Sequence, residues 1–364
     1  MTLTRLHHIA PAPDQGNPRN SEGAFITLKD GRIAFVYSRY NGSSADDHAY
    51  CEIAVITSPD RGETWSQPRI LAKPDFSKNE DNYMSVSLMR MANGDIGVFY
   101  LVKTKPLAAS LVLRRSADEL ETLGDPVRVV APHYPGYYVV NNDRVIRTEK
   151  GRLLTTAALH PCSLGYVEGD HLNIRARAVF FGSDDDGFTW RQLSEQISLP
   201  SMSYTGTGLQ EPGVIELPGG TLYAYFRTDL GRQYESVSID GGENWFAPQP
   251  SRFTSPDSPM LIKKNPYNNK YYALWNPAPL YPTRELTKKR WTGGRNPFVM
   301  AQSDDGVHFT APVVLEDDRE AGFCYPAMHF LDEKTALIAY CAGGIEPADW
   351  MCLVRTVISR VDLD

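Results

Sequence analysis

The sequence is poor in the features that mark disulfide-bonded and metal-binding proteins. Its 364 residues include an odd number of cysteines, five, scattered along the chain: Cys51, Cys162, Cys324, Cys341 and Cys352. No two of them form a Cys-x-x-Cys pair, so neither a disulfide framework nor a zinc site is indicated. No other metal-ligand constellation is present. We therefore expect a reduced compartment, no metal and no cofactor.

Long apolar runs and clustered positive charge are also missing. No segment approaches 18 consecutive apolar residues, so we expect no membrane-spanning segment. Residues 1–8 lack the apolar stretch of a secretory signal, which favours the cytoplasm, or secretion if a leader has been removed. The net charge is −7 and no basic stripe follows the chain, which argues against a nucleic-acid partner. The sequence is compatible with a homo-oligomer.

What the sequence does contain is a recurring motif of eight residues. Three copies, Ser58–Trp65, Ser183–Trp190 and Ser238–Trp245, share the pattern Ser-x-Asp-x-Gly-x-(Thr/Asn)-Trp, and weaker copies span Ser116–Leu123 and Gln302–Phe309. The Ser and Asp side chains can bond nearby backbone amides, and Gly can adopt a positive φ. The motif therefore predicts a stapled hairpin, with no part in calcium binding or catalysis.

A second repeated unit reads as a strand, a turn and another strand. It occurs at residues 24–37, 85–100, 144–158, 212–226, 259–275 and 326–340. Most of its turns carry Gly after Asp, Asn, Lys or Gly, which suits hairpins. The spacing of the repeats fits one four-stranded blade each. The sequence thus predicts an all-β fold, a six-bladed β-propeller, as a single domain over residues 1–364.

Two details of this propeller can be predicted. Residues 5–9 should close the ring beside the last blade, which removes a free sheet edge. The motif tryptophans occupy equivalent positions in the repeat, so each should be buried in its own blade: Trp65, Trp190 and Trp245.

Blade topology places polar residues at one end of the ring, opposite the motif hairpins. First strands begin near Glu22, Ser85, Asn142 with Arg144, Glu211, Ser258 and Tyr325. Second strands end near Arg39, Lys103, His160, Arg227 and Asn276, and third strands begin near Asp46, Asp47, His48, Arg175, Arg232 and Arg295. Polar groups that converge on a rigid scaffold are typical of a polar-ligand site. From this collection we select Glu22, Arg39, His48, Asn142, Arg144, Arg227, Arg232 and Arg295 as substrate-binding candidates.

The repeated motifs resemble the Asp boxes, or BNR repeats, of the sialidase (neuraminidase) superfamily. Glu211, in Gln-Glu-Pro-Gly-Val-Ile-Glu-Leu-Pro-Gly-Gly, is similar to the family's Asn-Glu-x-x-Val-x-Glu-Leu-x-x-Gly segment, whose Glu assists the catalytic tyrosine. Arg227, 16 residues further on, falls on the family's second substrate arginine. Arg295, eight residues before Ser303, resembles the third. The resemblance implies a propeller with Asp-box hairpins that acts on glycans.

Two more positions complete the implied catalytic set. Tyr325, in Cys-Tyr-Pro-Ala-Met-His-Phe, resembles the family's nucleophilic tyrosine. Asp47, or its neighbour Asp46, lies where the family keeps its acid/base. A phenol with a pKa of about 10 is a poor nucleophile unless a carboxylate takes its proton, and Glu211 could do so. Asp47 could then protonate the leaving oxygen.

One position departs from the family. The family's first substrate arginine stands ten residues before a turn glycine; counted back from Gly31, that position is Ser21. Arg19 lies two places away, and Glu22 is adjacent. A carboxylate there would repel an acidic sugar or hold another arginine. We therefore expect a substrate less acidic than sialic acid.

Three functions remain open on this evidence. The first is an exo-acting glycoside hydrolase that removes a terminal sugar from a glycan or oligosaccharide. The second is a lyase on the same propeller, in which Tyr325 or His48 abstracts a proton beside a uronate carboxylate. The third is a non-catalytic carbohydrate-binding propeller, which has no need of an activated phenol.

Overall fold

The computed structural model describes residues 1–104, 108–130, 136–161, 175–193, 196–200, 205–279, 294–318, 321–343 and 352–363. In these ranges the chain is all-β, apart from two single-turn 3-10 helices, η1 (Pro13–Gln15) and η2 (Phe76–Lys78). None of the helices in these ranges is long and apolar enough to cross a membrane. Cys162 lies outside the described residues.

The strands in chain order are β1 (Thr2–Ile9), β2 (Arg19–Thr27), β3 (Ile33–Tyr40), β4 (Cys51–Ser58), β5 (Arg69–Ala72), β6 (Glu80–Arg90), β7 (Ile96–Thr104), β8 (Ala108–Ser116), β9 (Val127–Arg128), β10 (Gly136–Val139), β11 (Ile146–Arg147), β12 (Leu153–Pro161), β13 (Arg177–Ser183), β14 (Arg191–Gln192), β15 (Gln210–Glu216), β16 (Leu222–Arg227), β17 (Arg232–Ser238), β18 (Gln249–Thr254), β19 (Leu261–Lys264), β20 (Tyr271–Trp275), β21 (Phe298–Ser303), β22 (Val313–Glu316), β23 (Gly322–Phe330), β24 (Thr335–Gly343) and β25 (Thr356–Asp362).

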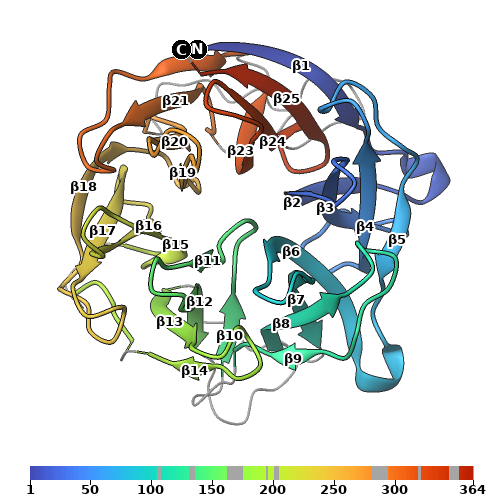
Figure 1. Cartoon of the computed structure of the whole chain (residues 1–364), viewed down its shortest axis with the longest axis horizontal. Coiled ribbons are helices and arrows are strands. Elements are labelled where there is room, and N and C mark those ends of the chain that lie inside the picture. Colours follow the sequence, from blue (N-terminus) through green and yellow to red (C-terminus); the bar gives the residue numbers. More distant parts are fainter. Residues whose placement is uncertain are drawn as a thin grey trace.

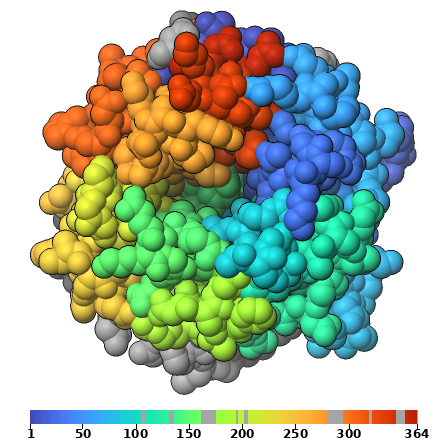
Figure 2. Space-filling model, viewed as in Figure 1, coloured from blue at the N-terminus to red at the C-terminus, as the bar shows by residue number. Residues whose placement is uncertain are grey.

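Antiparallel pairing divides these strands into groups that follow one another along the chain. The groups are β2–β5, β6–β9, β10–β14, β15–β18 and β19–β22, and then β23–β25 together with β1. Figure 1 shows them around a central axis, with β2, β6, β11, β15, β19 and β23 nearest to it. The face seen in Figure 2 is hollowed near its centre. This is a propeller-type arrangement.

The predicted strand pairs are present, with one difference. Most of the predicted hairpins form as β2–β3, β6–β7, β15–β16, β19–β20 and β23–β24. Where residues 144–158 were expected to hold one hairpin, the inner strand is broken. Both β10 and β11 pair with β12, and residues 140–145 run between them. The break includes Asp143, whose φ of 57° is incompatible with an extended strand.

The ring is closed by the two ends of the chain, as predicted. β1 pairs with β25 along its whole length, from Thr2 opposite Asp362 to Ile9 opposite Thr356. Arg5 also donates from Nε to Oε1 of Glu316 on β22, at 2.7 Å. The terminal strand therefore joins the last group and contacts the group before it (Figure 1).

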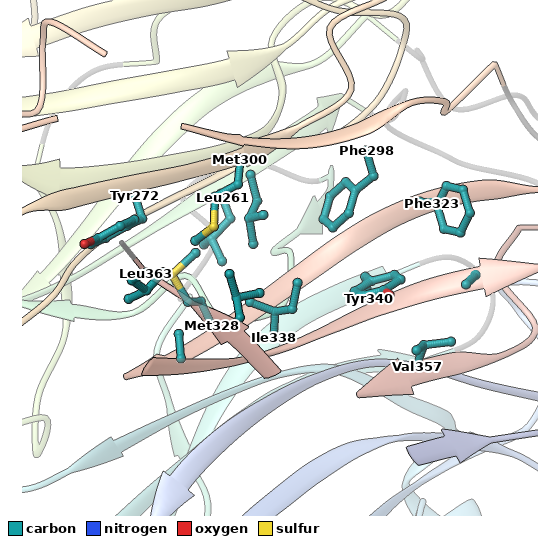
Figure 3. Packing of buried hydrophobic residues seen from close by; sticks show 14 of the residues in the cluster. Leu261, Tyr272, Phe298, Met300, Phe323, Met328, Ile338, Tyr340, Val357 and Leu363 are labelled. Carbon is teal, nitrogen blue, oxygen red and sulfur yellow. The ribbon is translucent and has the colours of Figure 1, made fainter. Parts of the chain in front are cut away.

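The hydrophobic core lies between neighbouring groups. In the cluster of Figure 3, Phe298 and Met300 of β21 pack with Ile338 and Tyr340 of β24. Comparable clusters join each group to the next, and one joins the last group to the first. Burial of this apolar surface holds the groups in fixed positions, so residues on different inner strands meet with defined geometry.

The repeated motif folds as expected. Ser58 Oγ accepts from the backbone N–H of Gly62 at 2.8 Å, and Asp60 accepts from that of Thr64 at 2.8 Å. The other two full copies repeat these bonds. Of the two weaker copies, Ser116–Leu123 keeps these bonds as well, although Leu120 occupies the glycine position with a φ of 73°. The hydroxyl and carboxylate staple is therefore what defines the turn.

The prediction for the motif tryptophans was wrong in its detail. All three indoles are half-buried, and their Nε1 groups donate to the carbonyl of the glycine three residues earlier. Trp245 stacks on Phe180 of β13, with centroids 4.0 Å apart, and Trp190 meets Phe99 of β7 edge-on. The bond to the motif glycine lays each ring flat over its own turn. Each ring therefore packs between its own group and a neighbouring one.

Candidate active site

The inner strands share an irregularity near the start of each predicted first strand. β-Bulges interrupt β2, β6, β15 and β23, and the bulged residues have a positive φ: Glu22 (49°), Ser85 (59°), Glu211 (43°) and Tyr325 (52°). Such conformations cost free energy for residues other than Gly and cluster at functional sites. A bulge also redirects its side chain. The fold thus uses one backbone device to present several polar side chains.

The aromatic surroundings of two bulges explain the small residues that follow them. A Cβ added to Gly23 would lie 2.4 Å from Cζ of Phe35, and one added to Gly213 would lie 2.2 Å from Cζ of Tyr225. Both rings are buried and cannot move aside. Glycine is therefore required here for close approach of a cross-strand ring.

A cavity of about 230 Å³ brings together residues that are far apart in the sequence. Its lining includes Asp47, Glu211, Arg227, Arg295 and Tyr325. The first is in the loop before β4, Arg295 precedes β21, and the others lie on β15, β16 and β23. All five were selected from the sequence as site candidates.

Tyr325 and Glu211 form the central contact of the cavity. The phenol donates its hydrogen to Oε1 of Glu211, at an O–O distance of 2.8 Å. Burial, and then the Glu211 carboxylate, raise the pKa of Tyr325 well above its ordinary value. The phenol is therefore protonated at rest, and its proton already points at a base.

Arg227 holds this base in place. Its Nη1 lies 2.9 Å from Oε2 of Glu211. Its Nε and Nη2 donate to the two oxygens of Asp257, at 2.6 and 2.9 Å. The bidentate pair with Asp257 fixes the plane of the guanidinium, and through it the orientation of Glu211.

Arg295 approaches Tyr325 from another side. Its guanidinium carbon lies 5.3 Å from the centroid of the Tyr325 ring, within the range of a cation–π contact. Its Nη1 lies 3.2 Å from the sulfur of Cys324. The side chain is 3% exposed, so its charge acts in a poorly solvated setting.

Arg19 is the residue that the sequence analysis undervalued. Its Nη1 donates to the Asp47 carboxylate and to the carbonyl of Ala45, and its Nε donates to Oγ of Ser21 at 3.0 Å. Its guanidinium also lies 4.4 Å from the centroid of the Tyr40 ring. The offset of two places from the family pattern concealed it, because counting back ten residues from Gly31 leads to Ser21.

Asp47 lies at the mouth of the cavity, with its side chain 57% exposed. Its backbone carbonyl accepts from Nζ of Lys103 at 2.6 Å and from Nδ2 of Asn82 at 3.3 Å. Loss of solvent opposes ionisation, but Arg19 and then Lys103 outweigh it and hold the pKa of Asp47 below its usual range. Asp47 is thus a carboxylate in the unliganded protein.

Glu22 is buried beside this ion pair. Its Oε2 accepts from Oγ of Ser85 at 2.9 Å, and its Oε1 lies 3.8 Å from Nη2 of Arg19. Burial raises the pKa of Glu22 from 4.5 to about 7, although Arg19 acts in the opposite direction. The sequence predicts that a carboxylate here would repel an acidic sugar or hold another arginine. In the structure Glu22 faces Arg19.

This pKa gives a testable pH dependence. Between pH 4.5 and 7 the folded protein holds a proton on Glu22 that the unfolded chain releases. The contribution of Glu22 to the free energy of unfolding therefore falls as the pH rises through this window. We expect Glu22→Gln to gain stability relative to the wild type between pH 4.5 and 8, by up to about 3 kcal/mol.

Denaturant unfolding at pH 4.5, 6 and 8 measures this difference. Glu63→Gln is the control, because the Glu63 side chain is half exposed, in a motif hairpin. Parallel pH profiles for Glu22→Gln and the wild type would contradict the raised pKa.

The remaining predicted site residues do not line the cavity. Arg39 bonds Asn41 beside it, and Arg232 is exposed on β17. His48 is exposed, with its ring 5.9 Å from that of Tyr137. His160, at the end of β12, lines the cavity instead.

Asn142 and Arg144 have structural partners across the axis. Asn142 donates from Nδ2 to the carbonyl of Gly23 at 2.9 Å and to that of Pro326 at 3.3 Å. Arg144 donates from Nη2 to the carbonyl of Met260 at 2.6 Å. Both side chains are almost completely buried. They brace inner strands from opposite sides of the ring, and Asn142 supports the backbone beside Tyr325.

Known proteins share this architecture. The solved structures that resemble the chain include a protein of unknown function from Dyadobacter fermentans (17% identity, TM-score 0.71, covering 100% of this chain and 99% of that one). Another is the NanB sialidase from Streptococcus pneumoniae (13% identity, TM-score 0.69, covering 100% of this chain and 71% of that one). A third is the leech intramolecular trans-sialidase complexed with 2,7-anhydro-Neu5Ac (14% identity, TM-score 0.72, covering 100% of this chain and 70% of that one). At these identities the likeness shows the fold alone.

Sequence comparison points the same way. A curated anhydrosialidase of Macrobdella decora is 36% identical over 70 residues, which are 19% of this chain and 8% of that protein. The family model of the BNR repeat-like domain matches residues 35–336, most of the chain. The chain therefore belongs to the family of BNR repeat-like domains, with the Asp-box fold of the sialidase superfamily.

Proposed function

We propose that this protein is an exo-acting glycoside hydrolase that removes a terminal sugar from a glycan or oligosaccharide, on a six-bladed propeller formed by residues 1–364. The observation that carries the proposal is the 2.8 Å hydrogen bond from the Tyr325 phenol to Glu211 inside a cavity lined by arginines. A buried phenol aimed at a carboxylate is a nucleophile with its base.

The proposed chemistry follows from this geometry. Glu211 takes the phenol proton as Tyr325 Oη attacks the anomeric carbon, which gives a tyrosyl-linked intermediate for water to hydrolyse. The positive charge of Arg227 and Arg295 stabilises the phenolate that develops in this step. Tyrosine replaces the carboxylate nucleophile of most retaining glycosidases, and its neutral resting state avoids repulsion from an anionic group on the sugar.

Asp47 is the proposed acid/base. Its exposed position at the cavity mouth suits contact with a leaving oxygen. In the unliganded protein, however, Arg19 keeps it ionised. For Asp47 to donate a proton, its ion pair with Arg19 must loosen when the sugar binds.

The charges of the site favour a substrate less acidic than sialic acid. Two of the three arginines at or beside the cavity already face carboxylates, in the pairs Arg19 with Asp47 and Glu22, and Arg227 with Glu211 and Asp257. An anionic sugar must compete with these carboxylates in a partly desolvated site, where repulsion is strong.

We therefore expect weak or absent hydrolysis of simple sialosides and faster hydrolysis of another terminal sugar. A panel of chromogenic aryl glycosides that includes sialosides, uronides and neutral sugars tests this, with Tyr325→Phe run beside the wild type. Efficient cleavage of an aryl sialoside that is lost in Arg227→Ala would overturn the substrate assignment. Binding without turnover of any glycan would point to a lectin.

A lyase is the second candidate, because His160 lines the cavity with Tyr325 and Arg227. A neutral imidazole, or the phenolate that forms when Glu211 takes the phenol proton, can abstract a proton next to a uronate carboxylate that an arginine neutralises. The product of such a reaction carries a new alkene that absorbs in the ultraviolet. Its appearance with a uronate-containing oligosaccharide would replace the hydrolase by the lyase.

A further inference from the structure

Three of the cysteines that are scattered in the sequence meet in the fold. Cys324 lies on β23, Cys341 on β24 and Cys352 shortly before β25, and each is at most 1% exposed. The three residues belong to one buried cluster, together with Leu353 and Val354. Within the described residues, no set of His, Cys, Asp and Glu side chains is placed to hold a metal ion. The chemistry open to the thiols themselves is therefore that of thiols and disulfides.

This thiol cluster, Cys324 with Cys341 and Cys352, lies directly against the candidate active site. Arg295 contacts the Cys324 sulfur at 3.2 Å. Tyr325 follows Cys324 in the chain, and Leu353, which follows Cys352, lines the cavity. The cavity and the thiol cluster therefore share Arg295 as a contact and adjoin each other in the chain at Tyr325 and Leu353.

The strand register suits a bond between Cys324 and Cys341. They are directly opposite each other in the antiparallel pair β23–β24. Opposite residues of such a pair have Cα atoms about 4.5 or 5.5 Å apart and side chains on the same face. Both separations fall within the range of about 4.4–6.8 Å found for disulfides. Cys352 has no such register with either residue.

The electrostatic setting makes Cys324 the reactive sulfur. Burial opposes ionisation, but the hydrogen bonds from Cys341 and Cys352 and the charge of Arg295 together hold the pKa of Cys324 below that of an ordinary thiol. The pKa values of Cys341 and Cys352 are raised, by burial and by the neighbouring sulfur. The thiolate is the form that attacks an oxidant.

We propose that Cys324 and Cys341 form a reversible disulfide when the protein meets a peroxide, and that this bond switches the neighbouring active site off. The Cys324 sulfur attacks one peroxide oxygen, the O–O bond breaks, and the leaving hydroxide takes a proton to become water. The Cys341 sulfur then attacks the sulfur of the resulting sulfenic acid and displaces hydroxide. This hydroxide takes the proton of the Cys341 thiol and leaves as a second water. In balance, two thiols lose two electrons and two protons, and hydrogen peroxide becomes two waters.

The effect on the site follows from the contacts of Cys324, and it rests on the proposed function. A disulfide draws the sulfur towards β24 and removes the acceptor of Arg295 Nη1. It also pulls on the residue before the bulge that presents Tyr325. Displacement of a positioned group by about 1 Å can cost roughly 100-fold in rate.

The test treats the reduced full-length protein with hydrogen peroxide, alkylates the remaining thiols and maps disulfides by mass spectrometry. We expect a Cys324–Cys341 link, two of the five thiols consumed, and reversal by a dithiol reductant. Cys352→Ser should still form the link, and Cys341→Ser should not. Cys51→Ser is the matched control, because Cys51 is also buried, on β4 outside the cluster.

Turnover of the glycoside identified by the panel is followed in parallel. A 10- to 100-fold loss that dithiol reverses supports the switch, and Cys341→Ser should resist it. Five free thiols after oxidation, or a link to Cys352, would overturn the proposal whatever the activity. A link that forms without any change in the turnover of an active enzyme would overturn the switch. If no glycoside is cleaved, the proposed function fails while the disulfide is still judged by the mapping.

Discussion

Tyr325→Phe and Glu211→Gln should each lower turnover by roughly 10³-fold while leaving the folded state nearly as stable as before. The first change removes the oxygen that attacks, and the second removes the base that receives its proton across 2.8 Å. Both replacements keep the shape of the side chain, so the cavity should stay packed. Steady-state kinetics on the glycoside from the panel and thermal unfolding of the same samples measure the two effects.

The two residues act as a unit, so their effects should not multiply. The double variant should be scarcely slower than either single variant, because one missing partner already leaves the other without a role. Losses that multiply would separate the two residues into independent functions.

The chain offers a matched control for this pair. Tyr340 donates to Oε1 of Glu316 at 2.5 Å, and Arg5 bonds the same carboxylate, so this trio repeats the Tyr–Glu–Arg chemistry outside the cavity. Tyr340→Phe should keep its turnover and lose stability, by about 1.5–3 kcal/mol for a hydrogen bond to a charged group. Loss of turnover in this variant to the level of Tyr325→Phe would show that the assay reports folding and not catalysis.

Arg227→Ala should be the second most damaging change, with turnover lower by roughly 10²–10³-fold. Removing the guanidinium takes away a charge that stabilises the developing phenolate. It also leaves Glu211 and Asp257 without their shared partner. Breaking such a buried pair also costs about 3–5 kcal/mol of stability.

Arg227→Lys separates the two consequences. Lysine keeps the charge but cannot donate two parallel bonds to Asp257, so the fold should survive while kcat falls. Arg152→Ala is the control, because Arg152 also bridges two carboxylates, Asp184 and Glu243, but in the motif hairpins. This exposed network is worth little, so Arg152→Ala should retain full turnover. Equal kcat in Arg227→Lys and the wild type would show that the charge alone is sufficient and that the bidentate pair with Asp257 does not position Glu211 for catalysis.

Much of the fold could be predicted because it is encoded locally. The Ser and Asp of each motif bond backbone amides within the same motif, so the eight-residue sequence alone predicts the hairpin. The strand pairs were equally local, except at residues 140–145, where the run Asn-Asn-Asp is compatible with the positive φ of Asp143 but does not show that the inner strand breaks there. The orientation of Trp245 was misjudged because its partner, Phe180, belongs to the neighbouring group.

The site was predictable only in part, because its contacts cross the ring. The sequence selected Tyr325, Glu211, Arg227 and Arg295, and the fold places all four around one cavity. It could not reveal that Asn142 would brace the backbone beside Tyr325 from another inner strand.

A second failure concerns Arg19. Counting back ten residues from Gly31 leads to Ser21, and the ion pair of Arg19 with Asp47 joins β2 to the loop before β4, which no local pattern shows. The thiol cluster was not predicted from the sequence for a related reason. Cys324 and Cys341 are brought together only by the register of β23 and β24.

The pairing of β1 with β25 has a consequence for how the protein is made. A ribosome releases the chain from its first residue onward, yet Thr2 finds its partner only when Asp362 has appeared. Until then β1 has no partner strand, and its unpaired edge favours association with another nascent chain. The same seam places the two termini side by side (Figure 1). New ends cut at a motif hairpin, with the old ends joined by a short linker, would let this group form early in synthesis.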